Sequence, residues 1–243
     1  VTESVDTSQV GGKGVFKVTT GITGLDEILR GGIPQGALTL FSGGPGTGKT
    51  MLGLEFLVRG AREGRPGILL SFEERKASLR RYAAAFGWDL AALEAQGHLA
   101  LVSARIPPDA VLSGDFDLGG VLAILRETAD TLGAEGVVID APDTLLRLLG
   151  DVAKERAELY ALNEWLRDEG MTAVLTAKQG SGGESGAYYE FLDYVADCVV
   201  RLDQLDLHPG PLIGDGAALI AQYLPAVLCA AFDAQQEPVQ LQR

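Results

Sequence analysis

The stretch SGGPGTGKT, residues 42–50, matches the pattern G-x-x-x-x-G-K-[ST] at each of its fixed positions. It follows a short apolar segment, residues 37–41, and precedes a segment with helical spacing, residues 50–64. Its glycines let the backbone turn tightly enough for successive N–H groups to point into one concavity. That concavity and the positive end of the next helix attract phosphate oxygens. The stretch therefore predicts a phosphate-holding loop between a buried strand and a helix.

The eight residues from the first fixed glycine onward are the candidate nucleotide contacts. Lys49 is expected to bring a mobile positive charge to the β- and γ-phosphate oxygens, and Thr50 is expected to give its hydroxyl to Mg²⁺. The backbone of the remaining residues is expected to form the cradle. The predicted nucleotide-binding set is Gly43, Gly44, Pro45, Gly46, Thr47, Gly48, Lys49 and Thr50.

Apolar segments and helical segments alternate along the rest of the chain. Further strands are predicted at residues 67–72, 98–104, 136–140, 171–177 and 194–203. Helices are predicted at residues 50–64, 78–88, 89–96, 118–133 and 153–170, and a short one between two turns at residues 19–36. This alternation predicts an α/β fold with a mostly parallel sheet and helices on both faces.

Three acidic residues follow predicted strands. Asp140 ends the apolar segment GVVID, where a carboxylate faces the ligand crevice of a parallel sheet. It is expected to hold Mg²⁺ through a water molecule, although it could instead start the following turn. Glu73 and Glu74 end the strand before them, and one of them could orient or deprotonate a water that attacks the γ-phosphate. The alternative is a solvated loop that opens a helix.

Composition limits the classes of partner. The net charge of -13 provides no basic surface for a nucleic-acid backbone by default. Cys198 and Cys229 lie in apolar settings without metal-ligand spacing and are expected to be reduced core thiols. The chain has no uninterrupted apolar run of about 18 residues, and its polar N-terminal residues lack a signal-peptide core. These features favour a cytoplasmic protein without a membrane span.

Several of these segments resemble one known family. TGITGLDEILRGGIPQGALTLFSGGPGTGKT, residues 20–50, looks like the start of the ATPase domain of KaiC, within the RecA-like P-loop superfamily. ILLSFEE, GVVIDAPDTLLR and AVLTAKQ fit the same family at matching intervals, as does YEFLDYVADCVVRLD. The resemblance covers roughly residues 16–203. Its most specific parts are the TG-x-x-x-LD-x-x-L-x-GG-x-P-x-G lead and the paired glutamates.

The resemblance implies a RecA-like P-loop NTPase core that binds ATP between neighbouring subunits of a ring, usually a hexamer. It implies that Glu73 and Glu74 are catalytic, and that Lys49, Thr50 and Asp140 serve ATP and Mg²⁺. KaiC itself carries two such domains and phosphorylates itself. The present sequence shows one, so a single-domain KaiC-like ATPase is the closer comparison, and neither clock function nor autophosphorylation carries over.

The C-terminal residues depart from that family. The sequence predicts a flexible lead at residues 1–14, an ATPase domain at residues 15–203 and an atypical tail at residues 204–243. The family's basic hairpin, which reaches the neighbour's ATP, cannot be located, because the tail has no Lys and its only Arg is Arg243. His208 is expected to be a turn residue, and the tail could be an unusual helix or a replacement for the hairpin. Lys178 is a candidate contact for the γ-phosphate.

Three functional hypotheses follow. The first is a Mg²⁺-dependent ATPase that switches the shape of a ring and so its affinity for a protein partner. The second is a RecA/RadA-type DNA-handling ATPase, which the candidate loop AKQGSGGESGAYYE does not favour, because it has one Lys and two Glu beside its tyrosine pair. The third is an ATP-binding regulatory module that barely hydrolyses. The basic cluster at residues 75–81 fits a solvated helix face, and it could instead be part of a subunit interface or reach the edge of the nucleotide.

Overall fold

The computed structural model describes residues 16–22, 24–104, 118–142, 151–178, 191–203 and 227–230. The predicted lead at residues 1–14, the glycine-rich loop after Lys178 and most of the tail lie outside these residues.

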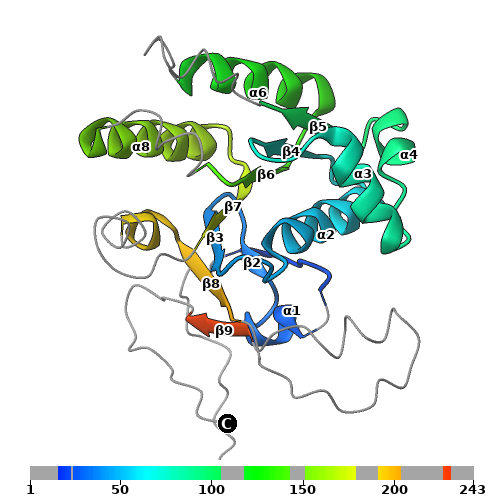
Figure 1. Ribbon diagram of the computed structural model, residues 1–243, viewed down its shortest axis with the longest axis horizontal. Coiled ribbons are helices and arrows are strands. Elements are labelled where there is room, and N and C mark those ends of the chain that lie inside the picture. The colour runs from blue at the N-terminus through cyan, green and yellow to red at the C-terminus, as the bar shows by residue number, and fades with distance from the viewer. Residues whose placement is uncertain are drawn as a thin grey trace, which may run out of the picture.

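A seven-stranded sheet has the order β5-β4-β6-β7-β3-β8-β9 (Figure 1). All neighbouring pairs are parallel except β8 and β9, which are antiparallel. The predicted α/β fold with a mostly parallel sheet is therefore confirmed. The strands are β3 (Leu38–Gly43), β4 (Gly67–Ser71), β5 (Leu99–Ser103), β6 (Gly136–Asp140), β7 (Thr172–Lys178), β8 (Cys198–Leu202) and β9 (Val227–Ala230).

Two of these strands differ from the sequence prediction. β8 begins four residues later than expected, because residues 191–195 before it are helical. β9 lies in the tail, for which a helix was one expectation. Instead these four residues pair with β8 at the edge of the sheet.

Helices cover both faces of the sheet, as the alternation predicts. On one face, α6 and α8 pack on alternate residues of the strands, and on the other face α1, α2, α3 and α4 pack on the residues between them. The helices are α1 (Leu25–Ile28), α2 (Lys49–Arg62), α3 (Lys76–Ala85), α4 (Leu90–Ala95), α6 (Leu118–Leu132) and α8 (Val152–Asp168).

The residues before β3 form a compact unit held by one carboxylate. β1 (Lys17–Val18) and β2 (Ile33–Pro34) pair antiparallel. Asp26 of α1 accepts hydrogen bonds from Thr20 N–H at 2.8 Å, Thr20 Oγ1–H at 2.7 Å and Gly21 N–H at 2.9 Å. The Thr-Gly and Leu-Asp pairs of the lead motif therefore have a structural role.

The sheet brings the carboxyl ends of β4, β6, β7 and β3 to one edge, because these strands are neighbours and parallel. In the register of the sheet, Asp140 lies beside Ser71 of β4 and Thr176 of β7. Lys178 lies beside Gly43, where the glycine-rich loop begins. Neighbouring strands are about 4.8 Å apart, so side chains from these ends meet in one place.

Helix α2 approaches this sheet closely at a glycine. A Cβ atom on Gly53 would lie 2.8 Å from Cγ1 of Val138 in β6, so only a residue without a side chain fits there undisturbed. Since α2 begins at Lys49, this contact also sets where the end of the glycine-rich loop lies relative to β6.

We expect the free energy of unfolding of Gly53→Ala to be about 1–3 kcal/mol lower than that of Gly60→Ala. Both changes improve helix propensity by about 1 kcal/mol. At Gly60 the added Cβ would lie 3.5 Å from the Arg65 carbonyl oxygen, which is ordinary contact, whereas at Gly53 it overlaps Val138. Thermal or urea unfolding of the two variants measures the difference. Equal stability would contradict the close approach of α2 to β6.

Candidate functional site

The glycine-rich loop joins β3 to α2 as predicted. Gly46 and Gly48 have φ values of 76° and 85°, which few other residues adopt. Gly48 precedes the first helical residue, and no side chain caps the helix. The first N–H groups of α2 have no partner within the helix, so this end is suited to bind an anion.

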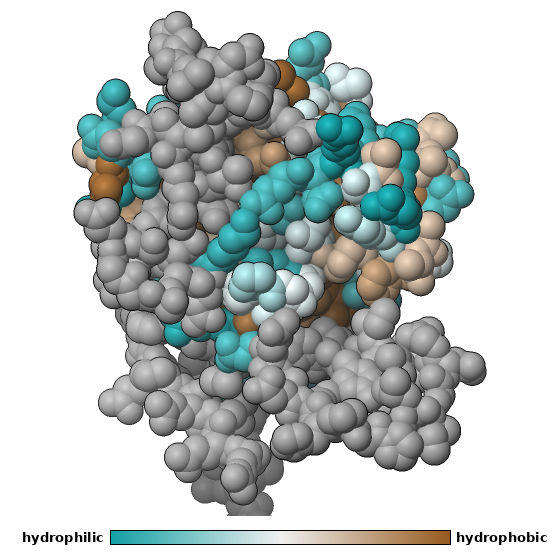
Figure 2. Space-filling model, viewed as in Figure 1, coloured by the Kyte–Doolittle hydropathy of each residue, from teal (hydrophilic) through white to brown (hydrophobic). Residues whose placement is uncertain are grey.

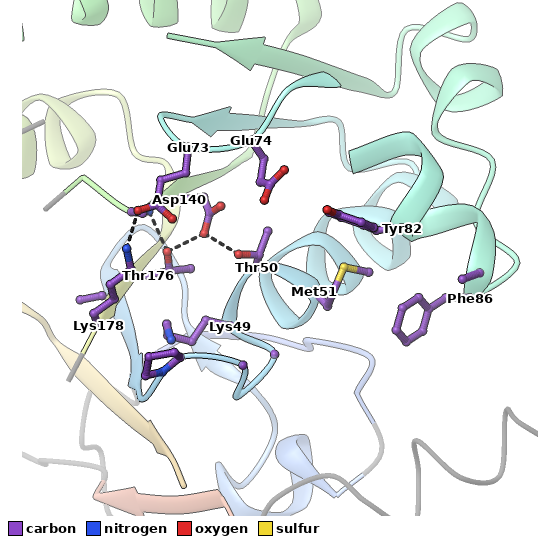
Figure 3. Close-up of a pocket in the computed structure, with 16 residues that line it drawn as sticks. Lys49, Thr50, Met51, Glu73, Glu74, Tyr82, Phe86, Asp140, Thr176 and Lys178 are labelled. Carbon is purple, nitrogen blue, oxygen red and sulfur yellow. Dashed lines mark hydrogen bonds and ion pairs between the residues drawn. The ribbon is translucent and has the colours of Figure 1, made fainter. Parts of the chain in front are cut away.

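Lys49 folds back over the loop. Its Nζ donates hydrogen bonds to the carbonyl oxygens of Gly43 at 2.9 Å and Gly44 at 2.7 Å. Figure 3 shows the ammonium directly above the loop. A flexible side chain of this kind can move its charge onto a phosphate that enters the loop.

Asp140 is the centre of a buried hydrogen-bonded group. Its side chain is 3% exposed and its Oδ1 accepts from Thr50 Oγ1 at 2.9 Å and from Thr176 Oγ1 at 2.7 Å (Figure 3). Thr176 Oγ1 in turn accepts from the N–H of Ala141 at 2.9 Å. The loop helix and two strands of the sheet are therefore joined through one carboxylate.

The pKa of Asp140 is raised above its ordinary value, chiefly by burial, which disfavours the charged form. Hydrogen bonds from Thr176 and Thr50 oppose this shift, and the negative charges of Glu73 and Glu74 add to it. A divalent cation beside the carboxylate would reverse the balance, because it favours the ionised form. The donor set fits Mg²⁺, which uses one or two protein oxygens together with phosphate and water.

The two glutamates reach the same space from the segment after β4. The N–H of Glu74 donates to Ser71 Oγ at 3.0 Å, and its carbonyl accepts from Ser103 Oγ at 3.2 Å, so its backbone is anchored to β4 and β5. Glu73 forms an ion pair with Lys178 at the end of β7. Figure 3 shows both carboxylates on the side of Asp140 that faces away from the loop.

These groups line one cavity of about 560 Å³, which is within the usual range for small-molecule sites. Its polar part holds the loop, Asp140, Thr176, Lys178 and the glutamates. Its apolar part is formed by residues at the start of α2 and along α3 (Figure 3): Met51, Tyr82, Ala85 and Phe86.

The cavity lining thus includes Glu73, Glu74, Asp140 and Lys178 together with part of the predicted loop set: Pro45, Gly46, Gly48, Lys49 and Thr50. The other predicted loop residues, Gly43, Gly44 and Thr47, are not part of the lining. Sequence reasoning missed Thr176, although a polar residue in the apolar segment TAVLTA, two positions before Lys178, was an available signal. It also missed Tyr82 and Phe86, which have helical i, i+4 spacing shortly after the glutamates.

The basic cluster at residues 75–81 is not part of the cavity lining. Arg80 pairs with Glu94 of α4, and the Arg81 guanidinium lies 5.2 Å from the centre of the Tyr82 ring. These contacts suit the solvated-face interpretation. Among the described residues, no group of three or more His, Cys, Asp or Glu side chains is placed to hold a metal ion by itself.

The described helices include none with the length and apolarity needed to cross a membrane. Figure 2 shows hydrophilic side chains across the middle of the described surface and weakly apolar ones beside them, over α3 and α4.

A glycine-rich loop between a central parallel strand and a helix, with an aspartate ending a nearby strand, defines a RecA-like P-loop fold. The family model "ATPase: KaiC" matches residues 18–208. This chain belongs to the KaiC ATPase family.

Two of the similar proteins differ in how much of their length this chain covers. The circadian clock protein KaiC2 of Synechocystis is 38% identical over 192 residues, which are 78% of this chain and 34% of that protein. This chain therefore spans about a third of the length of the clock proteins it matches. A UPF0273 protein of Aeropyrum pernix is 37% identical over 207 residues, 82% of each chain. The crystal structure of a KaiC-like protein of Pyrococcus horikoshii matches with a TM-score of 0.69 at 32% identity, covering 81% of this chain and 85% of that one.

The raised pKa of Asp140 gives a test in the absence of ligand. The folded protein holds this proton more tightly than the unfolded chain, so the stability that the group contributes is present at low pH and lost as the pH rises from 3.8 through the raised pKa. We expect Asp140→Asn, which lacks the charge, to be more stable than the wild-type protein at neutral pH. The difference should shrink as the pH falls through the raised pKa.

Thermal unfolding at a series of pH values measures this difference. Asp168→Asn, at the exposed end of α8, is the matched control and should show no such trend. A wild-type protein as stable as Asp140→Asn throughout the neutral range would contradict the burial penalty.

Proposed function

We propose that this protein binds ATP with Mg²⁺ in the cavity and hydrolyses it. The observation that carries the proposal is the hydrogen-bonded group of Thr50, Asp140 and Thr176. This group lines the same cavity as residues of the glycine-rich loop and the two glutamates, Glu73 and Glu74. Its hydroxyl and carboxylate oxygens would hold a Mg²⁺ ion beside the loop.

Each residue then has a definite task. The loop backbone from Gly43 to Gly48 and the start of α2 hold the phosphates, and Lys49 transfers its ammonium from the loop carbonyls to the β- and γ-oxygens. Thr50 would hold Mg²⁺ directly and Asp140 would hold it through water, and the bound Mg²⁺ would neutralise the charge that develops on the phosphates. Thr176 keeps Asp140 oriented.

Glu73 and Glu74 act on water. One carboxylate orients the attacking molecule and accepts its proton, while the water oxygen bonds to the γ-phosphorus and the bond from that phosphorus to the β-γ bridging oxygen breaks. The β-phosphate keeps the electron pair as ADP leaves. In support of this role, both glutamates line the same cavity as residues of the loop.

The apolar part of the cavity is where we place the base. Tyr82, Phe86 and Met51 offer an aromatic and apolar wall beside the phosphate loop, and a base can stack on such a wall. The choice of adenine follows from the family, and no residue that reads the edge of a base is assigned.

The proposal also includes assembly and use. As a KaiC-like protein, the chain forms a ring, with a hexamer as the expected size, in the cytoplasm, and ATP turnover changes the ring's affinity for a protein partner. Residues 15–203 form the ATPase domain and residues 204–243 the tail. Clock function and autophosphorylation are not included, because this chain spans about a third of the clock proteins it matches.

Purified protein should release phosphate from ATP in the presence of Mg²⁺, and the double variant Glu73→Gln/Glu74→Gln should be slower by about 100-fold or more, because general-base catalysis contributes at least that factor. Glu127→Gln/Glu164→Gln, at exposed positions of α6 and α8, is the matched control and should retain the wild-type rate.

The same assay separates the alternatives. An ATP turnover rate that is unchanged by single-stranded DNA supports the protein switch. Strong stimulation by DNA would instead support a DNA-handling ATPase. Tight ATP binding without turnover in the wild-type protein would favour an ATP-binding regulatory module. It would also contradict a catalytic role for Glu73 and Glu74.

The base site has its own test. Tyr82→Ala should raise the Kd for Mg·ATP by about tenfold, since stacking on an aromatic side chain is worth about 1–3 kcal/mol per base. Tyr194→Ala removes a tyrosine that is 79% exposed on another helical segment and should bind ATP like the wild-type protein. Calorimetric titration measures both. An unchanged Kd in Tyr82→Ala would place the base elsewhere.

A further inference from the structure

The ion pair between Lys178 and Glu73 joins two separate parts of the chain that both line the cavity. Glu73 follows β4, Lys178 ends β7, and β6 with Asp140 lies between these strands in the sheet. Figure 3 shows the pair on the side of Asp140 away from the helix α2. A proposed catalytic carboxylate is therefore held by a cation from another strand.

The strand that carries Lys178 also carries Thr176. Residues two apart on a strand point to the same face, so Lys178 projects to the side on which Thr176 contacts Asp140. In the sheet register Lys178 lies beside Gly43, the first residue of the phosphate loop. One ammonium thus lies between the loop that would hold the phosphates and the glutamate that would act on them.

The charges of the cavity favour movement of this ammonium. The described lining holds three carboxylates, on Glu73, Glu74 and Asp140, and two ammonium groups, on Lys49 and Lys178. A bound triphosphate adds several negative charges beside the loop, and its terminal phosphate carries more charge than one carboxylate. The side chains of Lys178 and Glu73 are 45% and 36% exposed, so their attraction is weakened by water and can be exchanged readily.

The carboxylate is also affected. An oxygen of Glu73 that accepts from the ammonium has less capacity to accept from a water molecule. Lys178 therefore competes with water for the carboxylate of Glu73 while the ion pair is present.

We propose that Lys178 and Glu73 form a latch that the γ-phosphate opens. Lys178 pairs with Glu73 when the site is empty or holds ADP, and it moves to the γ-phosphate when ATP binds. The freed Glu73 then acts on the attacking water, and the pair forms again after phosphate leaves. The latch rests on the proposed ATPase function, makes and breaks no covalent bond, and gives the site a preference for ATP over ADP.

Affinities for Mg·ADP and for a non-hydrolysable Mg·ATP analogue, measured by titration calorimetry, test the latch. Lys178→Met should raise the Kd for the ATP analogue by about tenfold or more, because a charge-assisted hydrogen bond is lost. It should change the Kd for Mg·ADP by less than about twofold. Lys178→Arg should retain most of the preference. Lys154→Met, at an exposed position of α8, is the control and should change neither affinity.

A variant of Glu73, the ion-pair partner of Lys178, should change the affinity for the ATP analogue relative to ADP in the opposite direction. Glu73→Gln should tighten the ATP analogue relative to ADP, since Lys178 no longer has to leave a carboxylate. That gain should disappear in the Lys178→Met background. A gain that persists there would reflect simple repulsion between Glu73 and the phosphate, and would overturn the latch.

The latch and the ATPase function fail in different ways. A wild-type protein that does not bind Mg·ATP overturns both. A wild-type protein that binds and hydrolyses ATP, with an unchanged ratio of analogue to ADP affinity in Lys178→Met, overturns the latch alone. In that case the ion pair contributes only to the stability of the fold, and thermal unfolding of Lys178→Met would show a loss without any change in nucleotide preference.

Discussion

The buried carboxylate of Asp140 is the point on which the site depends. It receives hydrogen bonds from Thr50 at the start of α2 and from Thr176 on β7, and it ends β6 itself. The carboxylate of Asp140 therefore joins the phosphate loop and α2 to the strands β6 and β7. The close approach of α2 to β6 at Gly53 makes this possible, because a larger residue would push the start of the helix away.

Much of the fold could be predicted because the sequence alternates strongly between apolar strands and helices. The loop was recognisable because the glycine spacing, Lys49 and Thr50 lie in one continuous segment. Thr176 stood out only as a polar residue in an apolar segment, and its contact with Asp140 could not be predicted, because it depends on the register between β6 and β7, which no local pattern specifies. β9 was missed for a related reason: its pairing with β8 joins segments separated by residues with no clear periodicity.

The carboxylates of the cavity are balanced by nearby hydrogen-bond donors and cations. Three carboxylates in one cavity repel one another, and the pKa of Asp140 is raised partly by Glu73 and Glu74. Hydroxyl donors, the ammonium of Lys178 and, in the proposed function, a divalent cation offset this repulsion. In the proposed function these charges suit a ligand that brings a metal ion, and a terminal phosphate competes with Glu73 for the ammonium of Lys178.

The decisive experiment measures the Kd for ATP with and without Mg²⁺ in the wild-type protein and in Thr50→Val. Thr50→Val keeps the shape of the side chain but removes the hydroxyl that joins the loop helix to Asp140. We expect Mg²⁺ to strengthen ATP binding in the wild-type protein, and we expect most of this gain to be lost in Thr50→Val. Equal strengthening in both proteins, or none in the wild-type protein, would contradict a metal-assisted phosphate site at Thr50 and Asp140.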